Sequence, residues 1–237
     1  MRLGDHDGRL VAYLGIRRAP RWWFEFVREE LMLRVVVRRL VCLLVAVVAV
    51  SSCERATAEV PPTSELSPIF SGTDLSGWHT KEPQYWTVAN GVLTGLNDEE
   101  KKGSMLYTDA SYGDVIFECE VRFSGEIDSG VMMRKPEVQV QIGVSRSLKR
   151  DMTCSFYVGG YPEEAQAKRA GELLKEGDWN RLRVQAKGNT FTVWLNGEQV
   201  SSYTNDKYAE AGPIGLQIHG GLVMKVEYRD IRAMELN

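Results

Sequence analysis

The sequence has little histidine and cysteine, and it lacks the short motifs on which several common chemistries depend. It holds three histidines and four cysteines in 237 residues. It contains no Gly-rich phosphate loop and no Gly-x-Ser-x-Gly, His-Glu-x-x-His or Cys-x-x-Cys motif. No apolar run reaches the roughly 20 residues that a membrane-spanning helix needs. These absences argue against a phosphate-loop protein, an α/β-hydrolase, a zinc protease and a polytopic membrane protein.

The chain also lacks a strong excess of charge of either sign. Its formal net charge is -3, which gives no reason to expect a nucleic-acid partner. The charge is unevenly distributed: residues 1–39 hold nine arginines and five acids, a sum of +4, so residues 40–237 sum to -7. The remaining composition, 43% hydrophobic and 26% charged, is ordinary for a globular protein and excludes collagen-like and disordered classes.

The first part of the chain has the pattern of an export signal. Residues 40–50 are eleven uncharged apolar residues, preceded by Arg34, Arg38 and Arg39 and followed by small residues. This pattern predicts a secretory signal peptide over residues 32–52. Val50-Ser51-Ser52-Cys53 resembles the lipobox of bacterial lipoproteins, which implies lipidation of Cys53 and a membrane anchor facing the periplasm or the cell surface. The alternative is an ordinary signal peptide, with Cys53 as a spare thiol.

The domain boundaries follow from this pattern. We expect translation to begin at Met32, with residues 1–31 as a gene-model extension. Residues 53–67 are rich in Ala, Pro, Ser and Thr and are predicted to form a flexible tether. Residues 68–237 are long enough for one sizeable core. Two cysteines remain in this part, Cys119 and Cys154. Export permits a disulfide between them, and two buried thiols are the alternative.

The folded part has the patterns of short β-strands. Apolar and charged residues alternate over residues 115–123, 181–187 and 224–229, which is typical of strands with one buried face. Asn90-Gly91 and Asn196-Gly197 each lie between two such runs and predict tight hairpins. The only helical candidate, residues 163–175, amounts to a turn or two in a long loop. The pattern therefore predicts an all-β chain forming an antiparallel β-sandwich or jelly roll.

Several strands carry unusual polar residues on the face that turns away from the core. Gln139 and Gln141 alternate with apolar residues, as do Gln217 and His219. Side-chain amides both donate and accept hydrogen bonds, as sugar hydroxyls require. If these strands are neighbours, one concave polar surface would carry Arg134, Gln139, Gln141, Gln217 and His219, with Tyr157 as a further binding candidate. The alternatives are a solvated sheet face and a structural histidine.

A series of motifs resembles one known family. Phe70–Trp78 (FSGTDLSGW) is similar to the opening LFNGKDLSGW motif of the bacterial 3-keto-disaccharide hydrolase family. Further motifs follow in the family's order, and the resemblance covers about residues 70–236. They are Trp86–Leu93, Tyr112–Asp114, Asp128–Val131, Trp179-Asn180, Trp194–Gly197, Gly212–His219 and Tyr228–Arg232.

The resemblance implies a concanavalin-like jelly-roll sandwich and cleavage of 3-keto-glycosides. A ketone at C3 acidifies the proton on C2; a base removes it, the C1 substituent leaves, and water adds to the unsaturated sugar. Our hypothesis assigns His219 as base or acid and Arg134 as the partner of the enolate oxygen. A divalent metal at the enolate would serve the same end, although the sequence identifies no ligand set for one.

The chain departs from the family at one position. The family often reads Glu-Val-Gln-Ile where this sequence has Gln139–Ile142. An amide cannot take up a proton at neutral pH, so Gln139 cannot replace a glutamate base or metal ligand. Glu137 could compensate only through a change of strand register. A non-catalytic, carbohydrate-binding lipoprotein that uses the same face is therefore the alternative, because fold alone does not settle function.

Overall fold

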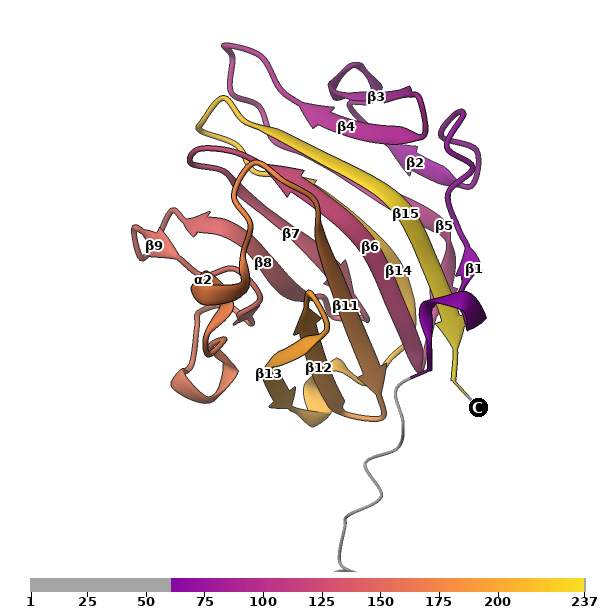
Figure 1. The fold of residues 1–237 in the computed structure, drawn as a ribbon, viewed down its shortest axis with the longest axis vertical. Helices are drawn as coiled ribbons and strands as arrows, with labels where there is room; N and C mark the ends of the chain where they lie inside the picture. Colours follow the sequence, from indigo (N-terminus) through magenta and orange to yellow (C-terminus); the bar gives the residue numbers. More distant parts are fainter. Residues whose placement is uncertain (1–60, 237) are drawn as a thin grey trace, which may run out of the picture. The chain divides into compact units, whose positions relative to one another are not determined.

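The structure, a computed structural model, describes residues 61–236. They form two antiparallel sheets, A and B, which confirms the predicted β-sandwich (Figure 1). The predictions for the start site, the signal peptide, Cys53 and the first part of the tether lie outside the described residues. Among residues 61–236, no helix has both the length and the apolar character needed to cross a membrane.

Sheet A has eight strands, and its long strands β15, β6 and β11 run side by side in Figure 1. A short strand, β1 (Ser67–Pro68), pairs with β15 outside the main path. The order along the main path is β13 (Glu198–Thr204), β12 (Thr190–Leu195), β11 (Asn180–Lys187), β6 (Val115–Phe123), β15 (Lys225–Glu235), β4 (Val92–Leu96) and β3 (Trp86–Ala89).

Sheet B has seven strands and lies behind sheet A in Figure 1. A short strand, β9 (Arg150–Asp151), pairs with β8. The order is β10 (Phe156–Tyr157), β8 (Val138–Ser145), β7 (Asp128–Met133), β14 (Gly212–Ile218), β5 (Ser104–Tyr112) and β2 (Trp78–Thr80). The helical segments are short: η1 (Thr63–Glu65), η2 (Pro83–Tyr85), η3 (Glu163–Ala165), α2 (Ala170–Leu173) and η4 (Asp206–Tyr208).

The local sequence patterns are confirmed element by element. The alternating run at residues 115–123 is β6, and its odd-numbered side chains lie in the core between the sheets. Both predicted hairpins are present. Asn90 and Gly91 have φ values of 53° and 78°, and Asn196 and Gly197 have 53° and 93°, as a turn with two left-handed residues requires. The predicted helical turns at residues 163–175 are η3 and α2.

The core takes side chains from both sheets, and both cysteines belong to it. Cys119 and Cys154 are fully buried and are free thiols, so the interpretation as two buried thiols holds. Burial raises the pKa of each thiol far above its ordinary value, because a thiolate is poorly solvated in an apolar interior. These cysteines therefore act as small apolar packing residues.

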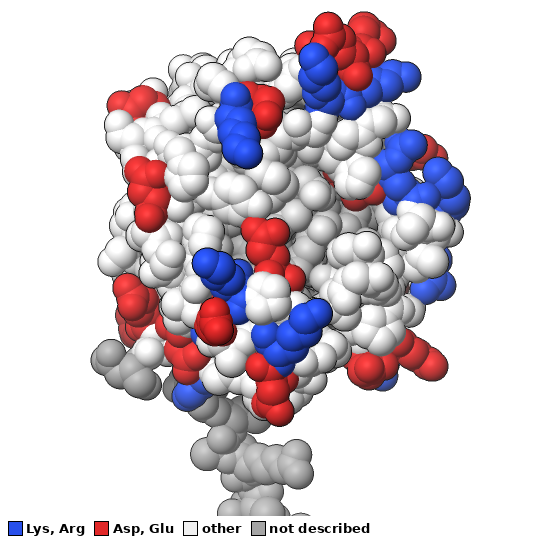
Figure 2. Space-filling view, turned by 180° about the vertical axis from the view of Figure 1, so that it is seen from behind, with Lys and Arg blue, Asp and Glu red and all other residues white. Residues whose placement is uncertain are grey.

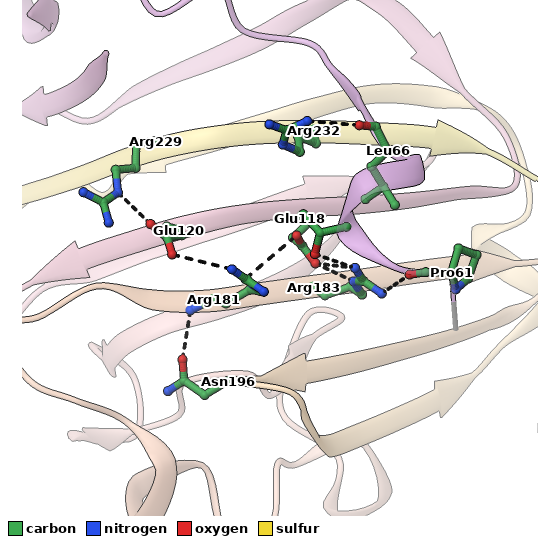
Figure 3. A network of polar contacts seen from close by, with 10 residues as sticks. Pro61, Leu66, Glu118, Glu120, Arg181, Arg183, Asn196, Arg229 and Arg232 are labelled. Carbon is green, nitrogen blue, oxygen red and sulfur yellow. Dashed lines mark hydrogen bonds and ion pairs between the residues drawn. The ribbon is translucent and has the colours of Figure 1, made fainter. Parts of the chain in front are cut away.

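The outer face of sheet A carries charged residues that pair across strands and also contact the first described residues (Figure 3). Arg183 Nε donates to Oε2 of the buried Glu118 at 2.6 Å, and Arg183 also donates to the carbonyl oxygen of Pro61 at 2.6 Å. Leu66 is only 2% exposed. The segment from Pro61 to Leu66, which the composition assigns to the tether, thus contacts sheet A through an arginine and buries an apolar side chain.

Candidate functional site

The predicted polar face exists on the outer side of sheet B, and strand register explains its composition. Gln139 of β8 lies opposite Tyr157 of β10 on one side and Met132 of β7 on the other. Strand β14 continues the face, because its Gly215 lies opposite Met132 and Gln217 is two residues further along. The structure therefore brings Gln139, Gln141, Gln217 and Tyr157 to one surface, with His219 just beyond the end of β14.

Two glycines allow this surface to be hollow. A Cβ atom on Gly130 would lie 2.6 Å from Nε2 of Gln139, and a Cβ atom on Gly215 would lie 2.6 Å from the ring of Tyr107. Real side-chain contacts are not that short, so only glycine permits Gln139 to lie across β7 and Tyr107 to lie across β14. The floor of the site is therefore formed by the side chains of Gln139 and Tyr107, which lie over the backbone of two glycines.

The glutamines form a connected hydrogen-bond network. Nε2 of Gln139 donates to Oε1 of Gln141 at 2.8 Å and to Oε1 of Gln217 at 3.3 Å. Nε2 of Gln141 donates to Oδ1 of Asp128 at 2.8 Å. The hydroxyl of Tyr161 donates to Oε1 of Gln141 at 2.9 Å. Since each partner limits the rotation of the next, the network holds these side chains in fixed orientations.

His219 presents one defined ring nitrogen to its surroundings. Its Nδ1 lies 2.6 Å from the carbonyl oxygen of Gly220, and a carbonyl oxygen can only accept a hydrogen bond. Nδ1 therefore carries a proton, so in the neutral ring Nε2 is the basic nitrogen. No hydrogen-bond partner of Nε2 occurs among residues 61–236. The backbone N–H of His219 donates to the carbonyl oxygen of Asp128 at 3.2 Å, which anchors the residue beside the glutamines.

Two cavities meet at Gln217 and His219, which line both. The larger has a volume of about 580 Å³ and the smaller about 260 Å³. Figure 2 shows this side of the molecule, where a hollow lies among largely uncharged side chains, with an acidic group (red) beside it and further charged groups around it. Other lining side chains include His79, Lys81, Glu82, Met105 and Tyr107 in the larger cavity, and Asp128, Gln139, Gln141, Arg146, Tyr157 and Tyr161 in the smaller.

Tyrosine hydroxyls in this groove are hydrogen-bond donors at neutral pH. Burial raises the pKa of Tyr161 to about 12. Burial and then the hydrogen bond to Glu137 raise the pKa of Tyr107 well above its usual value. The Tyr107 hydroxyl donates to Oε1 of Glu137 at 2.7 Å. Glu137 is among the lining residues of neither cavity, and its carboxylate already accepts the hydrogen bond from Tyr107.

Arg134 is not part of this face, and the prediction that placed it there is wrong. Strand β7 ends at Met133, and Arg134 has a φ of 69°, so the alternation of the strand does not extend to it. Its side chain is 3% exposed and donates to Oδ1 of Asp114 at 2.8 Å and to the carbonyl oxygens of Gly188 and Ala209. Arg134 therefore ties loops together, and we assign it no contact with a ligand.

The residues present do not fit a divalent metal site. Within residues 61–236, no group of three or more His, Cys, Asp or Glu side chains is placed to hold a metal ion. Asp128 uses both carboxylate oxygens to accept hydrogen bonds, one from Gln141 and the other from the backbone N–H of Arg146 at 3.0 Å. The amides that surround it are weak metal ligands, so no step below passes through a metal.

Sequence reasoning missed Asp128, Tyr107, Tyr161, Arg146 and His79 as groove residues. Tyr107 and His79 lie on adjacent strands in register with each other, and their ring centroids are 6.1 Å apart. His79 Nδ1 lies 2.7 Å from Oδ1 of Asp109 at the exposed edge. The alternation of Met105 and Tyr107 was a signal for this face, but only the pairing of β5 with β14 places them beside Gln217.

The chain matches the sequence model of a known family. The model described as a 3-keto-alpha-glucoside-1,2-lyase-like domain matches residues 65–234, which is nearly all of the folded part. A comparison with curated proteins gave no match.

Solved structures share the fold. A candidate glycosyl hydrolase from Parabacteroides distasonis is 20% identical with a TM-score of 0.57, over 73% of this chain and 100% of that one. A second from the same organism is 23% identical with a TM-score of 0.52, over 78% and 96%. A Bacillus subtilis protein with a galectin-like fold is 12% identical with a TM-score of 0.55, over 72% and 94%. At these identities the likeness shows a shared jelly-roll architecture.

Proposed function

Because this chain belongs to the 3-keto-alpha-glucoside-1,2-lyase-like family, we propose that it cleaves 3-keto-glycosides or 3-keto-disaccharides by elimination and hydration. The family match and the glycosyl hydrolase-like neighbours support an activity on carbohydrates. The observation that carries the specific reaction is the state of His219: a histidine whose Nδ1 donates to a carbonyl and whose Nε2 is unpartnered among the described residues.

The reaction needs one well-placed base. A ketone at C3 makes the proton on C2 acidic, and Nε2 of His219 removes it. The electron pair forms the enolate and then the C1–C2 double bond as the C1–O bond breaks. The leaving oxygen takes a proton from water, and the resulting hydroxide takes back the proton held by His219. Water then adds across that double bond, with its hydroxyl at C1 and its proton at C2, which yields the free 3-keto sugar. Proton transfer by a positioned side chain contributes about 10²–10⁴-fold to rates.

The shape of the groove supports a substrate made of two units. His219 and Gln217 line both cavities, so a scissile bond beside His219 would leave one unit in each. The volumes, about 580 and 260 Å³, are in the range of small-molecule sites or slightly below it. At the far end of the smaller cavity, the Tyr157 and Tyr161 rings lie 5.1 Å apart, centroid to centroid. Their faces and hydroxyls suit a sugar ring.

Carbohydrate binding without cleavage is the second candidate, and Gln139 is the observation that favours it. The family often has a glutamate at this position, whereas here an amide donates hydrogen bonds to two other glutamines. Such a network recognises hydroxyls but takes up no proton. The presence of His219 as a separate base is the reason that we rank the enzyme first.

One experiment separates the two candidates. The full chain is incubated with a 3-keto-glucoside, with and without EDTA, and release of the aglycone is followed alongside calorimetric binding. We expect turnover that EDTA leaves unchanged. Saturable binding without turnover would establish the binding module and reject the enzyme. Turnover abolished by EDTA would contradict the metal-independent route.

We also propose that the mature protein is exported and anchored to a bacterial membrane through a lipid on Cys53. The basic, apolar and small-residue pattern before Cys53 supports this. Metabolic labelling with an alkyne fatty acid should label the wild-type chain and leave a Cys53→Ser variant unlabelled. An unlabelled wild-type chain, or equal labelling of the variant, would refute the anchor.

A further inference from the structure

We propose that Asp128 is a positioning residue that sets the direction of every hydrogen bond in the glutamine network, so that Gln217 presents its amide NH₂ to the C3 oxygen of the ligand. The identification of that oxygen rests on the proposed function. The direction of the network rests on the geometry alone.

The direction of the hydrogen bonds is fixed at the buried end of the network. Asp128 is 4% exposed, and its Oδ2 accepts the backbone N–H of Arg146, which can only donate. Its other oxygen, Oδ1, faces the side chain of Gln141 at 2.8 Å. A carboxylate only accepts, so the Gln141 atom that faces it must be the NH₂ group. The carbonyl oxygen Oε1 of Gln141 is then turned toward Gln139 and toward the hydroxyl of Tyr161.

The orientations of the next two amides, those of Gln139 and Gln217, follow from their partners. Because Oε1 of Gln141 only accepts, the Gln139 atom 2.8 Å from it must be the NH₂ group. The carbonyl oxygen of Ser129 gives an independent check, since it lies 3.4 Å from the same nitrogen and can only accept. That NH₂ group also faces Gln217 at 3.3 Å, so the Gln217 atom there is Oε1. Each amide is therefore assigned from its partner's chemistry.

Two amide atoms remain at the groove end of the network. Neither Nε2 of Gln217 nor Oε1 of Gln139 has a hydrogen-bond partner among residues 61–236. Within these residues, Arg134 Nε is the only side-chain nitrogen or oxygen that is both buried and without a partner. The two amide atoms are therefore accessible to solvent and open to the groove. Gln217 offers a donor and Gln139 an acceptor, and this polarity would reverse if the amides were turned around.

The donor on Gln217 is well placed for an oxygen next to the reacting carbon. Gln217 and His219 are two residues apart at the same end of β14 and line the same two cavities. Two residues along a strand span about 7 Å. With Nε2 of His219 at the C2 proton, an amide NH₂ on Gln217 can reach the neighbouring C3 oxygen. A neutral donor at a developing oxyanion typically raises kcat by about 10²–10³-fold. Gln217 would thus stabilise the enolate oxygen, the role that the sequence hypothesis gave to Arg134.

The test uses a ligand that binds but cannot react. A 3-keto-1,5-anhydrohexitol has no exocyclic leaving group at C1, and its 3-deoxy counterpart lacks the C3 oxygen. We expect the full wild-type chain to prefer the ketone by about tenfold in Kd, as one well-made hydrogen bond provides. Gln217→Glu keeps an oxygen for Gln139 to bond but removes the donor. Asp128→Asn leaves only the long, 3.4 Å contact with the Ser129 carbonyl to orient Gln139, so the network can reverse. Both variants should lose the preference.

The control is Gln185→Ala, which removes an amide from the outer face of sheet A. It should keep the preference, and thermal unfolding of each variant checks that it is folded. A purely structural role for Asp128 would lower stability and leave the preference unchanged, which would overturn the proposal. Absence of any preference in the wild-type chain, or its survival in Gln217→Glu, would also overturn it. A wild-type chain that shows the preference but no turnover of glycosides would reject the proposed function alone.

Discussion

The imidazole Nδ1 of His219 lies 2.6 Å from the carbonyl oxygen of Gly220, its neighbour in the chain. This contact fixes the tautomer of the neutral ring, because a carbonyl cannot donate. His219→Asn is therefore the informative variant. The side-chain NH₂ of Asn can donate to the Gly220 carbonyl in place of Nδ1–H, but Asn has no group that replaces the basic Nε2.

We therefore predict that His219→Asn lowers kcat on a 3-keto-glucoside by about 10²–10⁴-fold while the chain stays folded. Gln185→Ala, which changes the opposite sheet, should retain wild-type turnover. Steady-state kinetics and thermal unfolding of the three proteins provide the measurement. Turnover of His219→Asn within a few-fold of wild type would show that another group is the base.

The floor of the groove depends on Gly130. A Cβ atom there would lie 2.6 Å from Nε2 and 2.7 Å from Cγ of Gln139, so Gly130→Ala must displace the end of that flexible side chain. We expect a small change in stability, under about 1 kcal/mol, and about a tenfold rise in KM as the hydrogen bonds of Gln139 are lost. Gly113→Ala is the matched control, because a Cβ atom there meets nothing within 4 Å. Equal KM values for the two variants would contradict this role.

The pair formed by Glu118 and Arg183 is buried, and it should matter for folding. The two side chains are 4% and 12% exposed. Arg183→Ala leaves the Glu118 carboxylate buried and without its main partner, which we expect to cost about 3–5 kcal/mol in the free energy of unfolding. Arg181 is 51% exposed and lies 4.0 Å from the same carboxylate, so Arg181→Ala should cost less than about 1 kcal/mol. Urea unfolding of both variants tests the difference, and similar losses would refute it.

The contact between Arg134 and Asp114 predicts a pH dependence of stability. Burial opposes ionisation of Asp114, but the hydrogen bonds from Arg134 and from the backbone of Gly188 outweigh it and lower its pKa. A carboxyl whose folded pKa is below its unfolded value, about 3.9, stabilises the fold above that value. This contribution is lost as pH falls through the lowered folded pKa.

Asp114→Asn should therefore be less stable than wild type at pH 7. The loss of hydrogen bonds to a charged group should lower the free energy of unfolding by about 1–2 kcal/mol. We expect a value near the lower limit, because the Asp114 side chain is 36% exposed and solvent weakens the ion pair. The gap between the two proteins should narrow below about pH 4 as Asp114 takes up a proton in the wild type. Urea unfolding at pH 7, 4 and 3 measures it, and a gap that is constant with pH would contradict the assignment.

Local features of this fold were predictable from the sequence, whereas cross-strand relationships were not. The hairpins at Asn90 and Asn196 and the two faces of β6 depend on neighbouring residues, and all are confirmed. Gln139 and Gln217 are 78 positions apart in sequence. Their contact depends on β7 lying between β8 and β14, which no local pattern encodes.

Arg134 shows why alternation alone fails at the end of a strand. Its position after Met132 and Gly130 placed it on the polar face, but one residue with a left-handed backbone ended the alternation. Tyr161 was missed for the opposite reason. It lies in a loop with no periodicity, and only the fold brings its hydroxyl to within 2.9 Å of Oε1 of Gln141.

The proposed reaction depends on Nε2 of His219 removing the proton on C2 of a 3-keto sugar. Exchange at C2 measures this step directly: a 3-keto-1,5-anhydrohexitol is incubated in D₂O with the protein, and deuterium at C2 is followed by NMR. We predict rapid exchange with the wild-type chain, at least 100-fold slower exchange with His219→Asn, and no change with Gln185→Ala. Wild-type exchange no faster than the buffer, or undiminished exchange with His219→Asn, would contradict the claim.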